Sequence, residues 1–216
     1  MKKVLFIFGT RPEAIKLAPL IKQFENEKKY FSSVVCSTGQ HKEMLDQVVD
    51  FFKLKIDYDL KLMKKNQTLS SLSSNILSGL DEVISEVNPN YVFVHGDTTT
   101  STFAAISAFY NQVPVCHIEA GLRTFNKYSP YPEEMNRSIT GRIADYHFSP
   151  TLESKQNLVQ ENIDEKSILV TGNTVIDALF SAVNELKTYE NNEIKSLKGL
   201  LVEGKKNILV TGHRRE

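Results

Sequence analysis

The chain has 216 residues, of which 41% are hydrophobic and 24% are charged. These values are ordinary for a globular protein with a buried core, and the length allows one large domain or one domain with part of another. Lys plus Arg and Asp plus Glu both number 26, so the formal net charge is zero. This balance argues against a general nucleic-acid or membrane-surface role, because phosphate-rich partners are usually met by a basic excess.

Cysteine usage and apolar runs bear on the cellular compartment. Cys36 and Cys116 each lie in an apolar run and form no Cys-x-x-Cys pair, which favours buried, reduced thiols. The apolar stretch 4–8 is too short for the hydrophobic region of a signal peptide. No later run approaches the roughly 18–20 apolar residues of a membrane span. We therefore expect a cytoplasmic protein without a membrane segment.

Short apolar runs alternate with helical patterns along the chain. Runs rich in β-branched and aromatic residues predict strands over 3–8, 32–38, 91–96, 113–119, 146–150, 167–172 and 207–212. Apolar residues at helical spacing predict helices within 14–24, 69–83 and 103–109, and a polar helical stretch covers roughly 175–198. Most of the strand runs are continuously apolar, as in parallel sheets covered on both faces. The pattern predicts an α/β fold with a doubly wound parallel sheet, followed by the start of a second α/β domain.

Charged side chains follow four of the predicted strands. In chain order they are Arg11, Glu13 and Lys16, then Asp97, then Glu119 and Arg123, and finally His213, Arg214, Arg215 and Glu216. Doubly wound sheets bind ligands at the carboxyl ends of their strands. We therefore expect these acids and bases to converge on one edge of the sheet.

The first of these loops, "FGTRPEAIK", has a clear physical interpretation. Thr10 and Glu13 have the spacing of a capping box, which favours a structural role for Glu13. Arg11 lies at a helix N-terminus, where a cation opposes the helix dipole, and this predicts an anionic partner. For Lys16, spacing alone leaves a solvated side chain and a ligand contact equally open.

For the carboxylates near the strand ends, the sequence alone leaves both a structural and a chemical role to be considered. Asp97 could cap the following helix, although Thr98 competes for that position. Glu119 precedes Ala-Gly-Leu and serves no capping pattern. Glu133 and Glu134 could be ordinary first-turn acids. Several carboxylates at one edge could also hold different pKa values, as acid–base chemistry requires.

Common motifs of other enzyme classes do not occur. The five histidines show neither H-E-x-x-H nor zinc-type Cys/His spacing, so we expect no metal site. The chain also has no G-x-S-x-G, G-x-x-x-x-G-K-[ST] or G-x-G-x-x-G, which disfavours serine hydrolases, P-loop proteins and dinucleotide-binding enzymes.

Six segments together resemble the non-hydrolysing UDP-N-acetylglucosamine 2-epimerases, in that family's order. They are "FGTRPEAIKLAPLI", "VHGDTTTSTFAAISAFYNQVPV", "HIEAGLRTFNKYSPYPEEMNR", "ADYHFSPT", "VTGNTVIDAL" and "ILVTGHRRE". The resemblance covers essentially the whole chain and implies two Rossmann-like domains in a glycosyltransferase-B-like arrangement, with the active site between them. It implies an N-terminal Rossmann-like domain over 1–172, a connecting helical segment over 173–198, and over 199–216 the first strand and loop of a truncated C-terminal nucleotide-binding domain.

The resemblance also implies a site and a reaction. It places Asp97, Glu119 and Glu133 as catalytic residues and Arg11, Lys16, Arg137 and His213 as substrate-binding residues. The substrate would be UDP-N-acetylglucosamine (UDP-GlcNAc), and the family needs no cofactor. A base removes the C2 proton while the C1–O bond to UDP breaks, giving 2-acetamidoglucal and UDP. UDP then adds back with protonation on the opposite face, giving UDP-N-acetylmannosamine for cell-surface polysaccharides.

Regulation and assembly follow from the same resemblance. Many bacterial members bind a second UDP-GlcNAc as an activator. Gln40 matches that candidate activator site, whereas Glu43 and Asn66 stand where Gln and Arg are often found. The family often forms homodimers. Because the remainder of the family's length supplies most contacts to uracil and ribose, we expect this chain alone to have little or no epimerase activity.

Two further classes of function stay open. The enzyme could act on a related sugar, such as a UDP-diacetamido-uronic acid, or could be a hydrolysing 2-epimerase. Alternatively, the chain could be a non-catalytic nucleotide-sugar-binding module. That reading predicts no effect of Asp97→Asn or Glu119→Gln in the complete protein.

Overall fold

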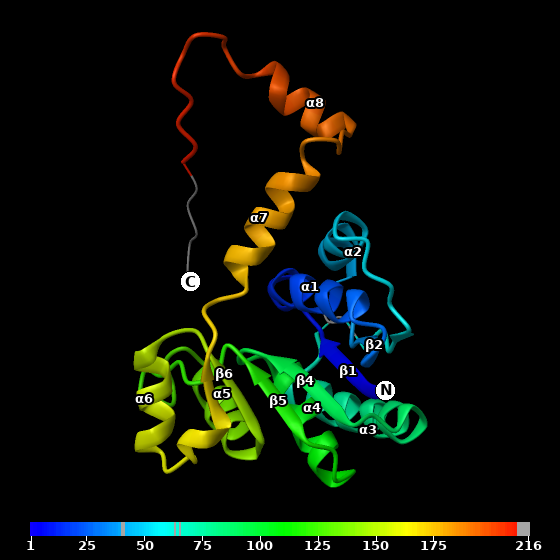
Figure 1. Ribbon diagram of the computed structural model, residues 1–216, viewed down its shortest axis with the longest axis vertical. Coiled ribbons are helices and arrows are strands. Elements are labelled where there is room, and N and C mark those ends of the chain that lie inside the picture. Colours follow the sequence, from blue (N-terminus) through cyan, green and yellow to red (C-terminus); the bar gives the residue numbers. More distant parts are fainter. Residues whose placement is uncertain (40–41, 63, 65, 211–216) are drawn as a thin grey trace. The chain divides into compact units, whose positions relative to one another are not determined.

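The computed structural model describes residues 1–39, 42–62, 64 and 66–210. Its centre is a parallel sheet whose strands have the order β3-β2-β1-β4-β5-β6-β7 (Figure 1). The strands are β1 (Lys2–Phe8), β2 (Phe31–Ser37), β3 (Tyr58–Asp59), β4 (Tyr91–His95), β5 (Val115–Ile118), β6 (Tyr146–Ser149) and β7 (Ile168–Val170). The strand order reverses between β1 and β4, so the topological switch point lies there.

The first six helices of the described chain connect successive strands, and the last two follow β7. They are α1 (Arg11–Asn26), α2 (Lys42–Phe51), α3 (Leu69–Val87), α4 (Thr99–Tyr110), α5 (Glu133–Ile143), α6 (Leu152–Gln160), α7 (Val175–Glu185) and α8 (Asn192–Gly199). None of the described helices is long and apolar enough to cross a membrane. The doubly wound α/β architecture predicted from the alternating pattern is confirmed.

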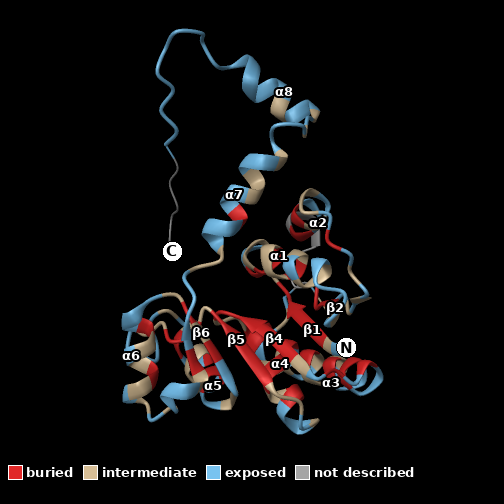
Figure 2. Ribbon diagram, viewed as in Figure 1, coloured by how far each residue is buried: buried red, intermediate tan, exposed pale blue. Residues whose placement is uncertain are grey.

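Alternate residues of β1 explain why this strand is continuously apolar. Val4, Phe6 and Phe8 pack into a core shared with α1 and α2. Leu5 and Ile7 face the opposite core, which contains α3 and α4. Both faces of the sheet are therefore buried, as Figure 2 shows along the central strands. Burial on both faces removes the need for polar alternation.

The chain divides into two units, Met1–Leu179 and Phe180–Glu216. The first unit contains the whole sheet. The predicted helical stretch 175–198 forms two separate helices, α7 and α8. Asn191 starts α8 by accepting a hydrogen bond from Ile194 N at 2.8 Å. The domain boundaries implied by the family resemblance stay a prediction.

The expected strand over 207–212 is not formed in its described part. Residues 207–210 have no regular structure, and Ile208, Leu209 and Val210 are 85–89% exposed. An extended segment becomes a strand only when a neighbour accepts and donates its backbone hydrogen bonds. No described strand lies in register with this segment.

Candidate functional site

The loops after β1 and β4 meet at the switch point through Glu13. Its buried carboxylate accepts hydrogen bonds from Gly9 N at 3.0 Å, Thr10 N at 2.8 Å and Thr98 Oγ1 at 2.7 Å. Burial raises the pKa of Glu13, although these hydrogen bonds act in the opposite direction. The structural interpretation of Glu13 is confirmed, since it ties the start of α1 to the start of α4.

Gly9 is required by the close approach of neighbouring side chains. A Cβ atom at this position would lie 2.3 Å from Thr100 Oγ1 and 2.4 Å from Thr38 Oγ1. The single glycine of this loop therefore serves packing at the strand end. The loop has no further glycines with which to cradle a phosphate through backbone N–H groups.

Asp97 is free for a role other than helix capping. Thr98 is the N-cap of α4 and accepts a hydrogen bond from Ser101 N at 3.0 Å. Asp97 instead pairs with Arg137 of α5, with 2.6 Å between Oδ2 and Nη2. The ion pair thus links the loop after β4 to α5.

The pKa of Asp97 depends on its burial and on the surrounding charges. Burial raises this pKa most strongly, and the carboxylates of Glu133 and Glu119 raise it further. Arg137 and Lys16 act against this rise. The predicted carboxylates and two of the predicted cations therefore share one electrostatic environment at the carboxyl edge of the sheet.

Among the predicted catalytic acids Asp97, Glu119 and Glu133, Glu119 makes the most contacts. It follows β5 with a φ of 62°, a left-handed backbone that few residues other than glycine adopt. Lys16 Nζ lies 2.8 Å from Oε1 and 2.5 Å from Oε2. Asn173 Nδ2 donates to Oε2 at 2.9 Å. Of the two readings open for Lys16, the structure shows a partnered side chain that is only 22% exposed.

Two histidines beneath this edge are neutral at pH 7. Burial and the nearby Lys16 lower the pKa of His95 to about 3, and its Nε2 lies 3.8 Å from Glu119 Oε2. That nitrogen has no hydrogen-bond partner among the described residues. Burial also lowers the pKa of His117 to about 3. His117 Nε2 carries the proton, because it donates to the carbonyl of Gly96 at 2.7 Å.

The two acids in the first turn of α5, Glu133 and Glu134, differ in their contacts. Glu134 is buried and accepts hydrogen bonds from the backbone N–H groups of Thr124 and Phe125, at 3.0 and 2.9 Å. Glu134 therefore holds the loop before α5. Glu133 Oε2 is buried and has no hydrogen-bond partner within the described part of the chain. Unlike Glu134, Glu133 keeps an uncommitted oxygen.

The other predicted residues are exposed or lie outside the described residues. Arg11 is the first residue of α1 and is exposed, so its anionic partner stays a prediction. His213 and Gln40 lie outside the described residues, as does the side chain of Glu43, whose backbone belongs to α2. Asn66 is described and has a φ of 59°.

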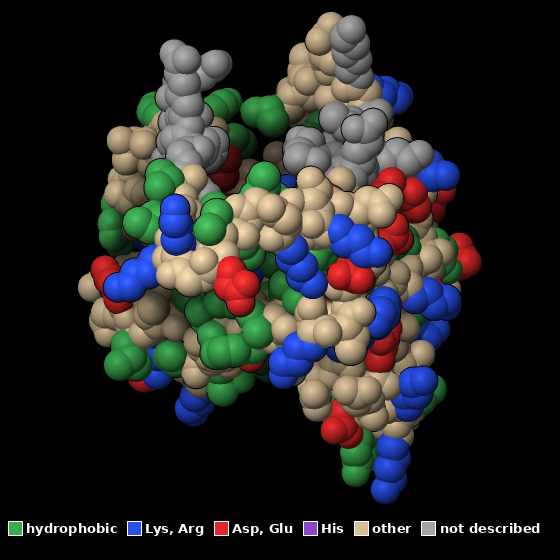
Figure 3. Space-filling model, turned by 90° about the horizontal axis from the view of Figure 1, so that it is seen from above, with side chains coloured by type: hydrophobic (Ala, Val, Ile, Leu, Met, Phe, Trp, Pro, Cys, Tyr) green, Lys and Arg blue, Asp and Glu red, His purple; other side chains and the backbone are tan. Residues whose placement is uncertain are grey.

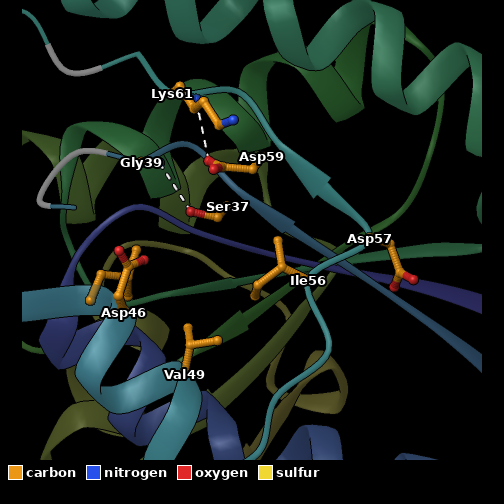
Figure 4. Close-up of a pocket in the computed structure, with 9 residues that line it drawn as sticks. Ser37, Gly39, Asp46, Val49, Ile56, Asp57, Asp59 and Lys61 are labelled. Carbon is orange, nitrogen blue, oxygen red and sulfur yellow. Dashed lines mark hydrogen bonds between the residues drawn. The ribbon is translucent and has the colours of Figure 1, made fainter. Parts of the chain in front are cut away.

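A separate pocket of about 320 Å³ lies at the carboxyl ends of β2 and β3 (Figure 4). Its lining residues are Ser37, Gly39, Leu45, Asp46, Val49, Ile56, Asp57, Asp59 and Lys61. None of these belongs to the predicted catalytic or substrate-binding set.

On the face shown in Figure 3, basic and acidic side chains are interspersed. Among the described residues, no group of three or more His, Cys, Asp or Glu is placed to hold a metal ion.

The contacts of Asn173 and His95 with Glu119 were not expected from the sequence. Asn173 lies in the segment "VTGNTVIDAL", but only the family resemblance drew attention to that segment. His95 follows a strand at the correct edge, which was the available signal. Neither contact could be read from spacing, because Glu119 is 54 residues from Asn173 and belongs to a different strand end from His95.

A doubly wound parallel sheet with two carboxylate–cation pairs at its switch-point edge defines a Rossmann-like α/β domain, a class of fold that binds ligands at this edge. The chain belongs to the UDP-N-acetylglucosamine 2-epimerase family, whose model matches residues 23–216. The predicted family resemblance is thereby confirmed.

Individual relatives agree with this assignment. The chain is 54% identical over 218 residues to a UDP-N-acetylglucosamine 2-epimerase of Salmonella borreze, covering 100% of this chain and 57% of that protein. A crystal structure of the Neisseria meningitidis UDP-GlcNAc 2-epimerase bound to UDP-GlcNAc superimposes with a TM-score of 0.85 at 50% identity, over 92% of this chain and 52% of that one. The Methanocaldococcus jannaschii UDP-GlcNAc 2-epimerase in complex with UDP-GlcNAc and UDP gives a TM-score of 0.82 at 32% identity, over 91% and 53%. The chain thus spans about half the length of the curated relatives it matches.

Proposed function

We propose that this chain supplies the N-terminal half of an active site that interconverts UDP-GlcNAc and UDP-N-acetylmannosamine. The observation that carries the proposal is the pairing of two carboxylates with two cations at one sheet edge, Glu119 with Lys16 and Asp97 with Arg137. Relatives that match the whole chain carry this activity in their names, and solved ones are bound to UDP-GlcNAc or UDP. The nucleotide sugar is therefore the proposed partner.

The reaction couples proton removal to departure of the nucleotide. A base takes the C2 proton, the C–H electrons form the C1–C2 double bond, and the C1–O bond breaks to release UDP. Re-addition of UDP to C1 is accompanied by protonation of C2 on the opposite face. Because the proton leaves one face and arrives on the other, more than one acid or base is needed, and Asp97, Glu119 and Glu133 are the proposed groups.

The cations have a complementary role. Lys16 and Arg137 already face carboxylates, and together with Arg11 and His213 they are proposed to stabilise the charge that develops on the departing diphosphate. The scheme uses no cofactor. Retention of UDP and the glycal in one site would distinguish the reaction from a hydrolysing one.

Product analysis in deuterated water tests this function in the full-length protein. Deuterium at C2 with the UDP-sugar retained supports epimerisation, whereas free N-acetylmannosamine with UDP indicates a hydrolysing enzyme. A solvent exchange seen only with another UDP-sugar would assign a different substrate. Asp97→Asn and Glu119→Gln are expected to lower kcat by about 10²–10⁴-fold. Unchanged turnover in both variants would favour a non-catalytic binding module.

The proposed function also has consequences for the activity of the chain alone, for the oligomeric state and for the cellular location. The 216-residue chain alone is expected to show little epimerase activity, and near-full turnover in a coupled assay would contradict this. The full-length enzyme is proposed to be a homodimer, which its mass in solution would report. A cytoplasmic location is proposed because Cys36 and Cys116 are free, buried thiols.

A further inference from the structure

The segment Thr171–Thr174, between β7 and α7, contains a side chain that contacts the proposed catalytic cluster. Asn173 Nδ2 donates to Glu119 Oε2 at 2.9 Å. The other end of the same amide, Oδ1, accepts a hydrogen bond from the backbone N–H of Val175 at 3.0 Å. Val175 is the first residue of α7. One half-buried amide therefore joins Glu119 to the start of α7.

The geometry around Glu119 shows why this amide matters. Lys16 approaches both carboxylate oxygens, so the ion pair alone leaves the plane of the carboxylate weakly defined. Asn173 donates to Oε2 only, which distinguishes the two oxygens. Nearby, His95 is neutral and its Nε2 lies at 3.8 Å, beyond hydrogen-bond distance. Among the described residues, Asn173 is thus the directional neutral donor to this carboxylate.

We propose that Asn173 is a positioning residue: its amide fixes the orientation of the Glu119 carboxylate and ties that orientation to the first turn of α7. This inference rests on the proposed function, since it assigns a purpose to the orientation of Glu119 in proton transfer. A catalytic carboxylate must lie within hydrogen-bond reach of the proton that it moves, and small misplacements reduce the rate strongly. Asn173 itself acts through Glu119.

Two substitutions separate positioning from a role in starting the helix. Asn173→Asp keeps an oxygen that can accept from Val175 N but replaces the donor to Glu119 with a second acceptor. Asn173→Ala removes both interactions. If Asn173 only starts α7, the Asp variant should behave like the wild type. If it positions Glu119, both variants should lose activity.

Asn111 provides a matched control. Its Nδ2 donates to Asp81 Oδ1 at 2.8 Å, an amide–carboxylate bond of the same kind between the C-cap of α4 and α3. In the full-length protein we expect Asn173→Asp and Asn173→Ala to lower kcat at least about tenfold relative to Asn111→Ala, as for loss of one hydrogen bond to a charged group. KM should stay near the wild-type value, because an interaction that orients a reacting group acts mainly on kcat. Wild-type kcat in Asn173→Asp, or a rise in KM that accounts for the whole loss, would overturn the inference.

A spectroscopic experiment on this chain tests the contact without relying on catalysis. In ¹⁵N-labelled protein, Glu119→Ala should shift the side-chain amide signals of Asn173 upfield and speed their exchange with water. The corresponding signals of Asn111 should not move. Unchanged Asn173 signals would refute the positioning contact. Absence of epimerase activity in the full-length wild-type protein would instead refute the proposed function, and the amide signals would still decide the contact.

Discussion

Replacing Glu13 by Ala should destabilise the sheet-containing unit, because three hydrogen-bond donors at the switch point lose their acceptor. The donors are the N–H groups of Gly9 and Thr10 and the hydroxyl of Thr98. Glu13 itself is only 2% exposed. The loss would therefore occur where water does not readily replace the carboxylate.

The expected loss in the free energy of unfolding depends on how far each of the three donors is buried. Gly9 is buried, and an unsatisfied buried donor costs about 1–3 kcal/mol. Thr10 and Thr98 are half-buried, so water can partly satisfy them, and Thr98 Oγ1 keeps a 3.4 Å contact with Ser101 Oγ. Removal of the carboxylate also relieves a desolvation cost, since burial raises the pKa of Glu13. We expect a net loss of about 2–3 kcal/mol, a large part of the roughly 5–15 kcal/mol typical of a domain.

The assay is urea unfolding at pH 7, followed by far-ultraviolet circular dichroism. Glu25→Ala on the same helix is the matched control, because Glu25 pairs with Lys22 at 2.9 Å and is much more exposed than Glu13. That control should stay within about 0.5 kcal/mol of the wild type. Glu13→Gln should fall between the two, since it keeps one acceptor oxygen. A loss in Glu13→Ala no larger than in Glu25→Ala would refute the reasoning.

Three other perturbations have defined outcomes. Arg137→Met removes a cation that lowers the pKa of Asp97, so this pKa, already raised by burial, should rise further in a ¹³C-carboxyl NMR titration; an unchanged pKa would contradict the ion pair. The folded-state pKa of His117 is about 3, below that of the unfolded chain. The contribution of His117 to the free energy of unfolding is therefore fully present above pH 6.5 and is lost as the pH falls toward 3, by up to about 1.4 kcal/mol per pH unit. His117→Asn should remove this part of the slope in urea unfolding at several pH values, and an unaltered slope would argue against a neutral buried imidazole. Gly121→Ala should prevent stable folding, because φ is 89° and a Cβ would lie 2.1 Å from a backbone oxygen of α6, whereas Gly199→Ala meets no atom within 4 Å and should leave the melting temperature unchanged.

Local chemistry accounts for the part of the fold that the sequence predicts. Continuous apolar runs identify strands buried on both faces, and Thr10 with Glu13 marks the start of α1. Strand β3 has only the two residues Tyr58 and Asp59, which is too short to carry a period. The segment 207–210 has strand composition, yet a strand depends on a partner that composition does not specify.

The candidate site was predictable as an edge of the sheet but not as a set of pairs. Topology places Asp97 and Glu119 after neighbouring strands, so their shared environment follows from strand order. The choice of Lys16 as the partner of Glu119 joins residues 103 apart and depends on side-chain rotamers and on the loop backbone. Likewise, Arg137 reaches Asp97 only because α5 begins where the loop before it is held by Glu134.

The left-handed backbone of Glu119 limits which substitutions can be interpreted at this position. A β-branched residue with a φ near 62° is a genuine conformational outlier, so Glu119→Val would strain the turn as well as remove the acid. Asparagine tolerates this conformation well, and an unbranched Gln keeps the side-chain length. A library of variants at this position would thus confound backbone tolerance with chemistry unless it left out the β-branched residues.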